Sequence, residues 1–278
     1  MTGRTSVRRV MWALVPVELP LLIASAAGVP LPRAVVLFAR ILVVAAVVVE
    51  TVLLLRGWLS ARRRGLSRVA ALRETAYGLL PRVAVRLMVH EVRCLRSIWF
   101  RVRRRTHGVG PGDHAAGYTA PQSATMWSLI GLSVVETAAL AFLIPWPVVH
   151  LVLLVLGVYG TVFMVGMQAA CAVRPHVAGA DGSLRLRYGA LFDLRIPAGD
   201  IVRVRIDRRF PPGGLITAHD DGSVDLAVGG QTNVAVDLVS PVTYTRPLGR
   251  AGTARTVRFH ADDPQALVAA LGGGVRTA

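Results

Sequence analysis

Arginine is the residue type best able to do chemistry in this chain, and that chemistry is the binding of anions. All 32 basic residues are Arg, and the planar guanidinium pairs well with phosphates and carboxylates. The residues expected to contact anions fall into two groups, one in residues 82–105 and one in residues 184–209. They are Arg86, Arg93, Arg101 and Arg104 in the first group and Arg185, Arg187, Arg203 and Arg205 in the second.

Anionic lipid headgroups are the expected partners of these arginines, because a basic surface near a membrane is attracted to its negative charge. In the second group the alternative stays open that the arginines occupy ordinary solvent positions, partly balanced by Asp193, Asp200 and Asp207. A protein partner or a second copy of the chain also stays open. Nucleic acid is disfavoured, because no recognisable DNA-reading motif accompanies the arginines.

A second set of candidate residues is polar and lies within apolar stretches: Glu18, Arg40, Glu50 and Glu136. Charge inside a bilayer is expensive, so each residue is a functional hypothesis. The glutamates could share a proton or coordinate a cation between helices. The structural alternative is favoured: a protonated Glu can hydrogen-bond to a neighbouring helix, and Arg40 can extend its guanidinium to the membrane surface.

Catalytic and metal-binding patterns are lacking in the sequence. It has no phosphate-binding glycine loop, zinc-ligand spacing or serine nucleophile motif. His90 and Cys94 are four residues apart and could share a helical face, but two ligands do not make a metal site. We therefore expect no enzyme activity and no cofactor.

The composition indicates membrane spans separated by basic loops. Hydrophobic residues make up 53% of the 278 residues, and the net charge is +16. Four stretches reach the roughly 20 apolar residues that a bilayer core requires. They cover residues 11–29, 34–55, 124–144 and 148–171.

The four stretches form two similar pairs, each joined by a short Pro-X-Pro turn at residues 30–32 and 145–147. Such turns leave room only for helical hairpins. Residues 56–123 hold fourteen Arg against three acidic residues, and arginine-rich segments stay in the cytoplasm. We therefore expect a multi-pass protein of the cytoplasmic membrane with both termini inside the cell.

Residues 82–105 are expected to form an amphipathic helix within a cytosolic basic segment, 57–107. Val85, Met88, Val92, Leu95, Trp99 and Val102 recur every three or four residues along one face. This face either lies in the lipid headgroup layer or packs on the following domain, and the sequence does not decide between the two. Residues 108–123 are rich in Gly, Pro and Ala and are expected to be a flexible linker.

Residues 172–278 change from continuous apolar runs to alternation, which predicts about seven short strands. The expected strands cover residues 184–188, 191–196, 200–207, 215–219, 223–228, 233–238 and 254–260. A C-terminal helix follows, with Asp263 as N-cap and Pro264 in its first turn.

The segments LRLRYGALFDLRIPAGDIVRV, NVAVDLVSP and VRFHADDPQALVAAL resemble the bacterial pleckstrin-homology-like (PH-like) domain over residues 176–272. The resemblance implies a β-barrel or sandwich that binds a partner and has no catalytic residues. The predicted fold is thus a membrane α + β protein: hairpins at 1–56 and 124–171, the basic segment, the linker, and a PH-like domain at 172–278. The predicted function is a non-enzymatic interaction or regulatory module at the inner leaflet. The alternative is a small transporter, or part of one, that uses the intramembrane glutamates.

Overall fold

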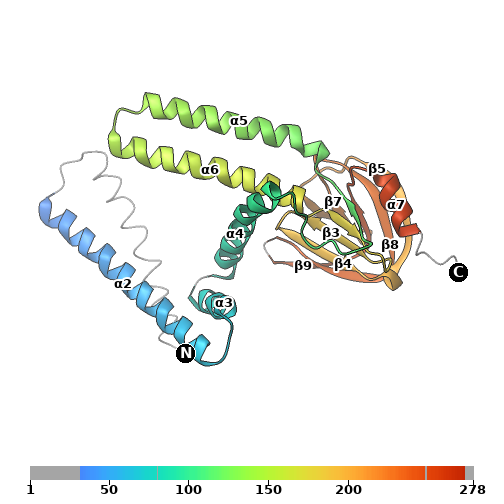
Figure 1. The fold of residues 1–278 in the computed structure, drawn as a ribbon, viewed down its shortest axis with the longest axis horizontal. Helices are drawn as coiled ribbons and strands as arrows, with labels where there is room; N and C mark the ends of the chain where they lie inside the picture. Colours follow the sequence, from blue (N-terminus) through green and yellow to red (C-terminus); the bar gives the residue numbers. More distant parts are fainter. Residues whose placement is uncertain (1–31, 80, 248, 273–278) are drawn as a thin grey trace. The chain divides into compact units, whose positions relative to one another are not determined.

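A computed structural model describes residues 32–79, 81–247 and 249–272 of the chain. Within it the chain divides into two compact units. The first comprises residues 1–88 and 141–153, and the second comprises residues 89–140 and 154–278. The second unit holds most of α5 and α6 together with all of the β structure (Figure 1).

The first unit contains α2 (Arg33–Arg63) and α3 (Arg68–Leu79), which pack against each other. The turn between them is held by the Arg62 side chain, whose Nη1 donates to the Leu66 carbonyl at 2.6 Å. An ion pair between Arg64 and Glu74 also joins them. The unit also includes the start of α4 (Arg82–Val102). The amphipathic helix predicted over 82–105 is thereby confirmed as far as Val102.

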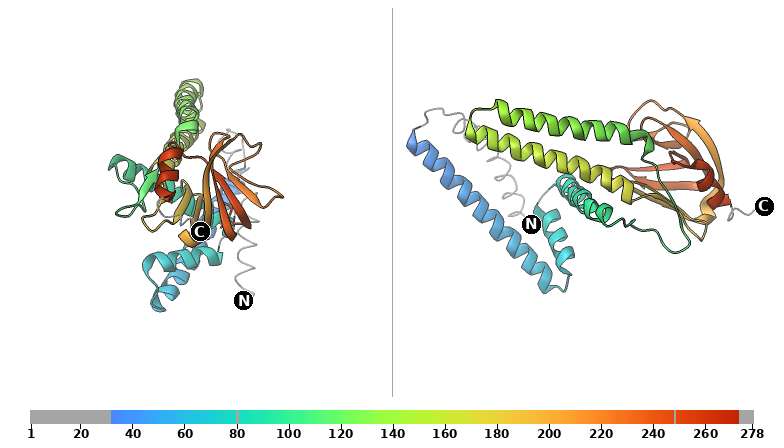
Figure 2. Two further views of the ribbon diagram at one scale, coloured as in Figure 1. Left: turned by 90° about the vertical axis from the view of Figure 1, so that its right-hand side faces the viewer. Right: turned by 45° about the horizontal axis from the view of Figure 1, so that its top comes forward.

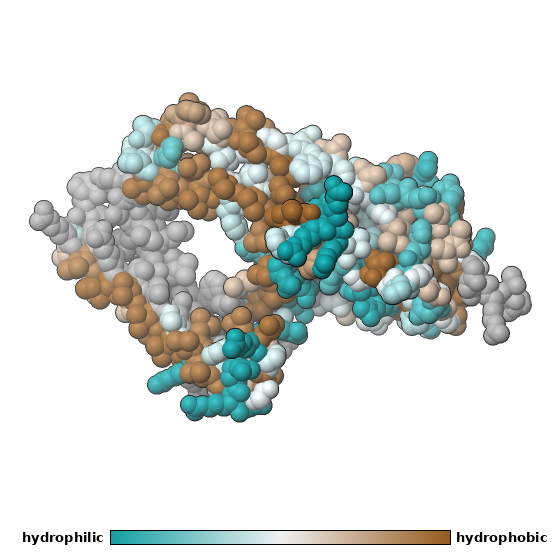
Figure 3. Space-filling view, in the orientation of Figure 1, coloured by the Kyte–Doolittle hydropathy of each residue, from teal (hydrophilic) through white to brown (hydrophobic). Residues whose placement is uncertain are grey.

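Two helices, α5 (Ala120–Leu143) and α6 (Pro147–Val173), are long and apolar enough to cross a membrane. They match the spans expected at 124–144 and 148–171. Only 6% and 0% of their most apolar windows are buried, whereas the core helix of a soluble protein is mostly buried. Figures 1 and 2 show the two helices side by side in both views, and Figure 3 shows mostly apolar side chains on their visible surface.

The expected arrangement of four spans is not supported. The span at 11–29 lies outside the described residues, and the one at 34–55 forms part of α2. This helix is not among the two that qualify as spans, and it continues past residue 55 to Arg63 without a break. Within the described part of the chain, two helices are therefore candidate membrane spans.

The first of two β-sheets is antiparallel and has the order β1-β2-β3-β4. Its strands are β1 (His114–Ala116), β2 (His176–Ala178), β3 (Leu184–Tyr188) and β4 (Phe192–Ile196). β1 comes from the segment that the sequence predicts to be a flexible linker, so this part of residues 108–123 is ordered structure. Three residues are too few to show strand periodicity in a sequence, and the pairing of His114 with Ala178 is a contact across 64 positions.

The second sheet has the order β5-β8-β9-β7-β6, with β7 and β9 parallel and the other neighbours antiparallel. A short 3₁₀ helix, η1 (Ala198–Asp200), leads into it from β4. Its strands are β5 (Ile201–Arg209), β6 (Ile216–Ala218), β7 (Ser223–Leu226), β8 (Thr232–Thr245) and β9 (Ala251–Phe259).

The hydrophobic core lies between the two sheets and is closed by α7 (Pro264–Gly272), which buries Leu267 and Leu271. The predicted cap is present, because Asp263 Oδ1 accepts a hydrogen bond from the Ala266 amide at 2.9 Å. All seven predicted strands occur, but β1 and β2 raise the total among the described residues to nine. The domain is a pair of sheets rather than a closed barrel.

Candidate anion-binding site

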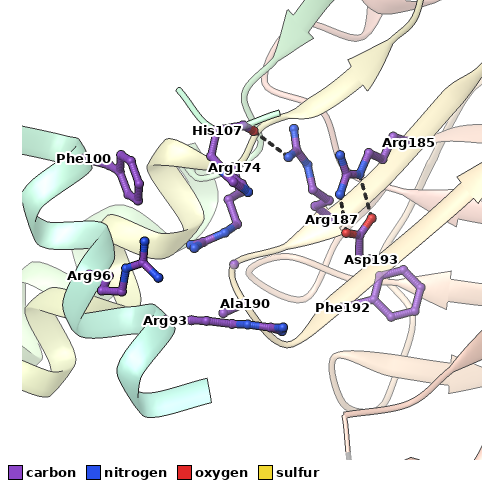
Figure 4. Close-up of a pocket in the computed structure, with 11 residues that line it drawn as sticks. Arg93, Arg96, Phe100, His107, Arg174, Arg185, Arg187, Ala190, Phe192 and Asp193 are labelled. Carbon is purple, nitrogen blue, oxygen red and sulfur yellow. Dashed lines mark hydrogen bonds and ion pairs between the residues drawn. The ribbon is translucent and has the colours of Figure 1, made fainter. Parts of the chain in front are cut away.

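A cavity of about 340 Å³ lies between the C-terminal part of α4 and the β3–β4 hairpin. Figure 4 shows its side chains reaching in from both sides. Five of the lining residues are arginines, against a single acidic side chain, Asp193. The arginines are Arg93, Arg96, Arg174, Arg185 and Arg187.

α4 supplies Arg93 and Arg96, which are three residues apart and so share a face of the helix. A different face of α4 packs on α6: Cys94 and Ser97 are fully buried there. The close approach depends on Gly166 of α6, where an added Cβ would lie 3.1 Å from the Cys94 carbonyl oxygen. This packing holds the two arginines at the edge of the cavity.

Arg174 is the first residue after α6 and is almost fully buried. Its Nη1 donates to Ser97 Oγ at 2.7 Å. Within the described residues no carboxylate lies at ion-pair distance from this guanidinium. Burial lowers its pKa, as expected for a cation removed from water without a counter-charge.

Arg187 is the most buried arginine of the site, with 1% of its surface exposed. Its Nε donates to the Pro175 carbonyl at 2.8 Å and its Nη1 to the His107 carbonyl at 2.6 Å. Its Nη2 is buried and has no hydrogen-bond partner in the described part of the chain. Burial, followed by the charge of Arg185, lowers the pKa of Arg187 to about 10, so the side chain is still charged at neutral pH.

Arg185 is the neutralised member of the group. Its Nε donates to Asp193 Oδ1 at 2.8 Å, and its Nη2 reaches the other carboxylate oxygen. This hydrogen bonding to the Asp193 carboxylate raises the pKa of Arg185. In the part of the chain that the structure describes, the other four guanidiniums have no carboxylate at ion-pair distance, so the cavity is suited to an anion.

The cavity lies at the end of the β domain from which α6 emerges. The β3–β4 turn packs on α6, since an added Cβ at Gly189 would lie 3.2 Å from Cys171 Sγ. Gly189 has φ +49°, a backbone conformation that favours glycine in this tight turn. The His107 amide donates to the Val173 carbonyl at 2.8 Å, which ties the segment after α4 to the last turn of α6.

Three of the eight arginines expected to contact anions line this cavity: Arg93, Arg185 and Arg187. The structure does not bring the others to it. Arg86, Arg101 and Arg104 are exposed on or after α4. Arg203 and Arg205 lie on β5 in the other sheet, and Arg205 pairs with Asp237 at 3.1 Å.

Sequence reasoning missed Arg96 and Arg174. Arg96 lies one helical turn after Arg93, so a search for arginines at this spacing could have found it. Arg174 directly follows an apolar span, where an arginine is readily explained as a marker of membrane orientation. Its contact with Ser97 spans 77 positions and has no local signal.

The expected apolar face of α4 is largely exposed. Trp99 is 56% exposed and Val102 is 71% exposed, and Val92 is similarly open. The alternative in which this face packs on the following domain is therefore wrong for these three residues, because Cys94 and Ser97 form the packing face instead. Arg103 stacks over the Trp99 ring, 4.0 Å from its centroid.

The intramembrane polar residues form no cluster that the structure describes. Glu18 lies outside the described residues, and Arg40 and Glu50 lie in α2 at positions whose side chains are not described. Glu136 is exposed on α5. Polar contacts between α5 and α6 are instead made by a hydrogen bond of 2.9 Å between the hydroxyls of Ser133 and Thr161 and by one of 3.2 Å from Gln168 Nε2 to Ser123 Oγ.

His90 and Cys94 are in contact, with 3.5 Å between Nε2 and Sγ. Among the described residues no group of three or more metal-binding side chains gathers. No protein-family model matches the chain, and no curated protein or solved structure is significantly similar to it.

Proposed function

We propose that the chain is a non-enzymatic, membrane-anchored module that binds the phosphate of an anionic lipid headgroup in the arginine cavity. The observation that carries this proposal is the buried Nη2 of Arg187, a charged donor that has no hydrogen-bond partner among the described residues and lies beside four other arginines. A buried unpaired guanidinium is destabilising, and a phosphate oxygen would compensate both its charge and its hydrogen-bonding capacity.

The position of the cavity favours a lipid as the source of that phosphate. Arg174 follows the last residue of α6, and the β3–β4 turn contacts the same helix. The exposed apolar side chains of Trp99 and Val102 lie on the helix that carries Arg93 and Arg96. A helix with an apolar face beside arginines lies well in the headgroup layer, where lipid phosphates are found.

The same proposal includes the orientation of the chain in the membrane, its number of spans and the relationship of its β domain. Loop charge supports a cytoplasmic side for the arginines and for both termini, and hence the inner leaflet of the cell membrane. The four-span arrangement rests on the apolar sequences at 11–29 and 34–55. The pattern of strands followed by one helix supports a PH-like relationship.

Replacing Arg96 with Gln is expected to weaken lipid binding about tenfold, the loss of one charge-assisted hydrogen bond. The measurement is calorimetric titration of the detergent-solubilised full chain with dihexanoyl-phosphatidylglycerol. Arg101→Gln is the matched control, because Arg101 is exposed on the same helix but does not line the cavity.

Two further titrants identify the phosphate source. Dihexanoyl-phosphatidylcholine should bind more weakly than the anionic lipid, and inorganic phosphate should also bind more weakly, because it lacks the lipid part. Equal affinities of the Arg96→Gln and Arg101→Gln chains would contradict the proposed site. Binding of inorganic phosphate as tight as that of the lipid would show a soluble anion to be the ligand.

A further inference from the structure

One end of the β5-β8-β9-β7-β6 sheet gathers the ends of all five strands. Arg209 at the end of β5 pairs with Thr232 at the start of β8. Phe259 at the end of β9 pairs with Val234 of β8 and with Leu226 at the end of β7. Leu226 in turn pairs with Ile216 at the start of β6.

This end of the sheet is also where α5 and α6 join the β domain. Asp262, three residues after β9, accepts a hydrogen bond from the amide of Ala120 at the start of α5 (3.0 Å). An added Cβ at Gly229 would lie 2.7 Å from Pro121. His176, just after α6, contacts the His260 carbonyl through Nε2 at 3.1 Å. The end that carries residue 210 therefore faces the bilayer that α5 and α6 enter.

The segment between β5 and β6, residues 210–215, connects the two outer strands of this sheet. Four strand spacings amount to about 19 Å. Seven residue steps from Arg209 to Ile216 reach at most about 23–25 Å. The segment is thus long enough to cross the membrane-facing end of the sheet, and the chain bends along residues 212–215 of its sequence, Phe-Pro-Pro-Gly-Gly-Leu.

Phe210 opens this segment and is 72% exposed. Arg208 and Arg209 precede it and are also exposed, and Arg209 is held by Asp207 at 3.0 Å. Arg208 is in none of the ion pairs among the described residues. An exposed aromatic ring beside a free guanidinium matches the boundary between acyl chains and phosphates.

We infer that residues 208–212 form a second membrane contact, in which Phe210 enters the bilayer and Arg208 binds lipid phosphates. This contact is separate from the arginine cavity and does not depend on a ligand there. It fixes a second point of the β domain on the bilayer, in addition to the α5–α6 hairpin. The partner is the anionic membrane surface into which those helices insert.

The test attaches the fluorophore NBD to Phe210→Cys in the full chain, reconstituted in nanodiscs of phosphatidylcholine and phosphatidylglycerol. Cys94 and Cys171 are buried, and the unsubstituted chain is labelled in parallel to measure background. NBD at position 210 should emit at shorter wavelength and lose about half of its emission when the acyl chains are brominated.

Val239→Cys is the matched control. Val239 is 64% exposed and follows Leu238, which pairs with Ile201 at the opposite end of β5. NBD at position 239 should not be quenched. Arg208→Gln should reduce quenching at position 210 when phosphatidylglycerol is present, and should have little effect in pure phosphatidylcholine. Arg96→Gln should leave the quenching at position 210 unchanged, so a failure of the cavity proposal would not hide this result.

Equal quenching at positions 210 and 239 would overturn the inference. A blue shift at 210 without quenching by brominated lipid would also overturn it, because it would show that protein rather than lipid covers Phe210.

Discussion

Replacing Arg187 with Gln is expected to weaken binding of the anionic lipid about a hundredfold or more. Removing one partner of a buried, hydrogen-bonded charge pair costs about 2–5 kcal/mol. Arg187 is the most buried guanidinium of the cavity, and its Nη2 has no hydrogen-bond partner within residues 32–79, 81–247 and 249–272, which leaves it available to a phosphate oxygen. The dissociation constant for dihexanoyl-phosphatidylglycerol, measured calorimetrically on the full chain, gives the result directly.

Two further variants separate binding from folding in this experiment. Arg187→Lys keeps the charge but cannot donate to Pro175, to His107 and to a ligand with the same fork geometry, so its affinity should be intermediate. Arg255→Gln changes an exposed arginine on β9 and should bind normally. A folded Arg187→Gln protein with wild-type affinity would remove Arg187 from the site.

Stability is expected to fall steeply as the pH drops from about 6.5 toward 4, chiefly because of His176. This imidazole is fully buried, and its Nδ1 accepts the Arg187 amide at 3.1 Å. Its Nε2 is therefore the protonated nitrogen that donates to the His260 carbonyl. Burial lowers the pKa of His176 from 6.5 to about 3, so the folded protein keeps the ring neutral.

The loss of stability at low pH follows from the difference in proton binding between the folded and the unfolded chain. Between pH 6.5 and about 3 the unfolded chain binds this proton and the folded chain does not, so stability is lost as the pH falls. The loss is at most about 1.4 kcal/mol per pH unit for one group. Burial lowers the pKa values of His107 and His260 in the same direction. The lowered carboxylate pKa values, such as that of Asp221, act at lower pH.

Thermal unfolding of the detergent-solubilised chain at pH 7.5, 6 and 5 measures this effect. His176→Gln should be less stable at pH 7.5 but should show a shallower pH dependence. His114→Gln, on the neighbouring strand β1, should keep the wild-type slope. An unfolding midpoint that does not change between pH 7.5 and 5 would show that protonation of His176 is not coupled to folding.

The sequence was sufficient to predict the elements with local periodicity. The α5–α6 hairpin, α4 and α7 were predicted close to their observed bounds, because apolar runs and helical spacing are visible within a few turns. β1 and β2 could not be predicted, since each has three residues and exists through pairing with distant segments. The pairing of β8 and β9 is interrupted around residues 238–241. For this reason the full length of both strands was not predicted.

The arginine cavity was only partly predictable, because it too depends on contacts between distant segments. Alternation placed Arg185 and Arg187 on one face of β3, where the structure has them opposite the buried Leu184 and Leu186. Which basic surface would face that strand depends on tertiary packing of α4 on α6 at Gly166. No pattern in the sequence indicates that contact, so Arg174 could not be joined to the group, whereas the spacing of Arg96 after Arg93 could have included it.

Native mass spectrometry of the full chain, purified from membranes in mild detergent, tests most directly whether the arginine cavity binds an anionic lipid. The wild-type chain is expected to retain one anionic phospholipid, Arg187→Gln to lose it, and Arg101→Gln to keep it. Retention of zwitterionic and anionic lipids in equal amounts, unchanged in Arg187→Gln, would contradict the account.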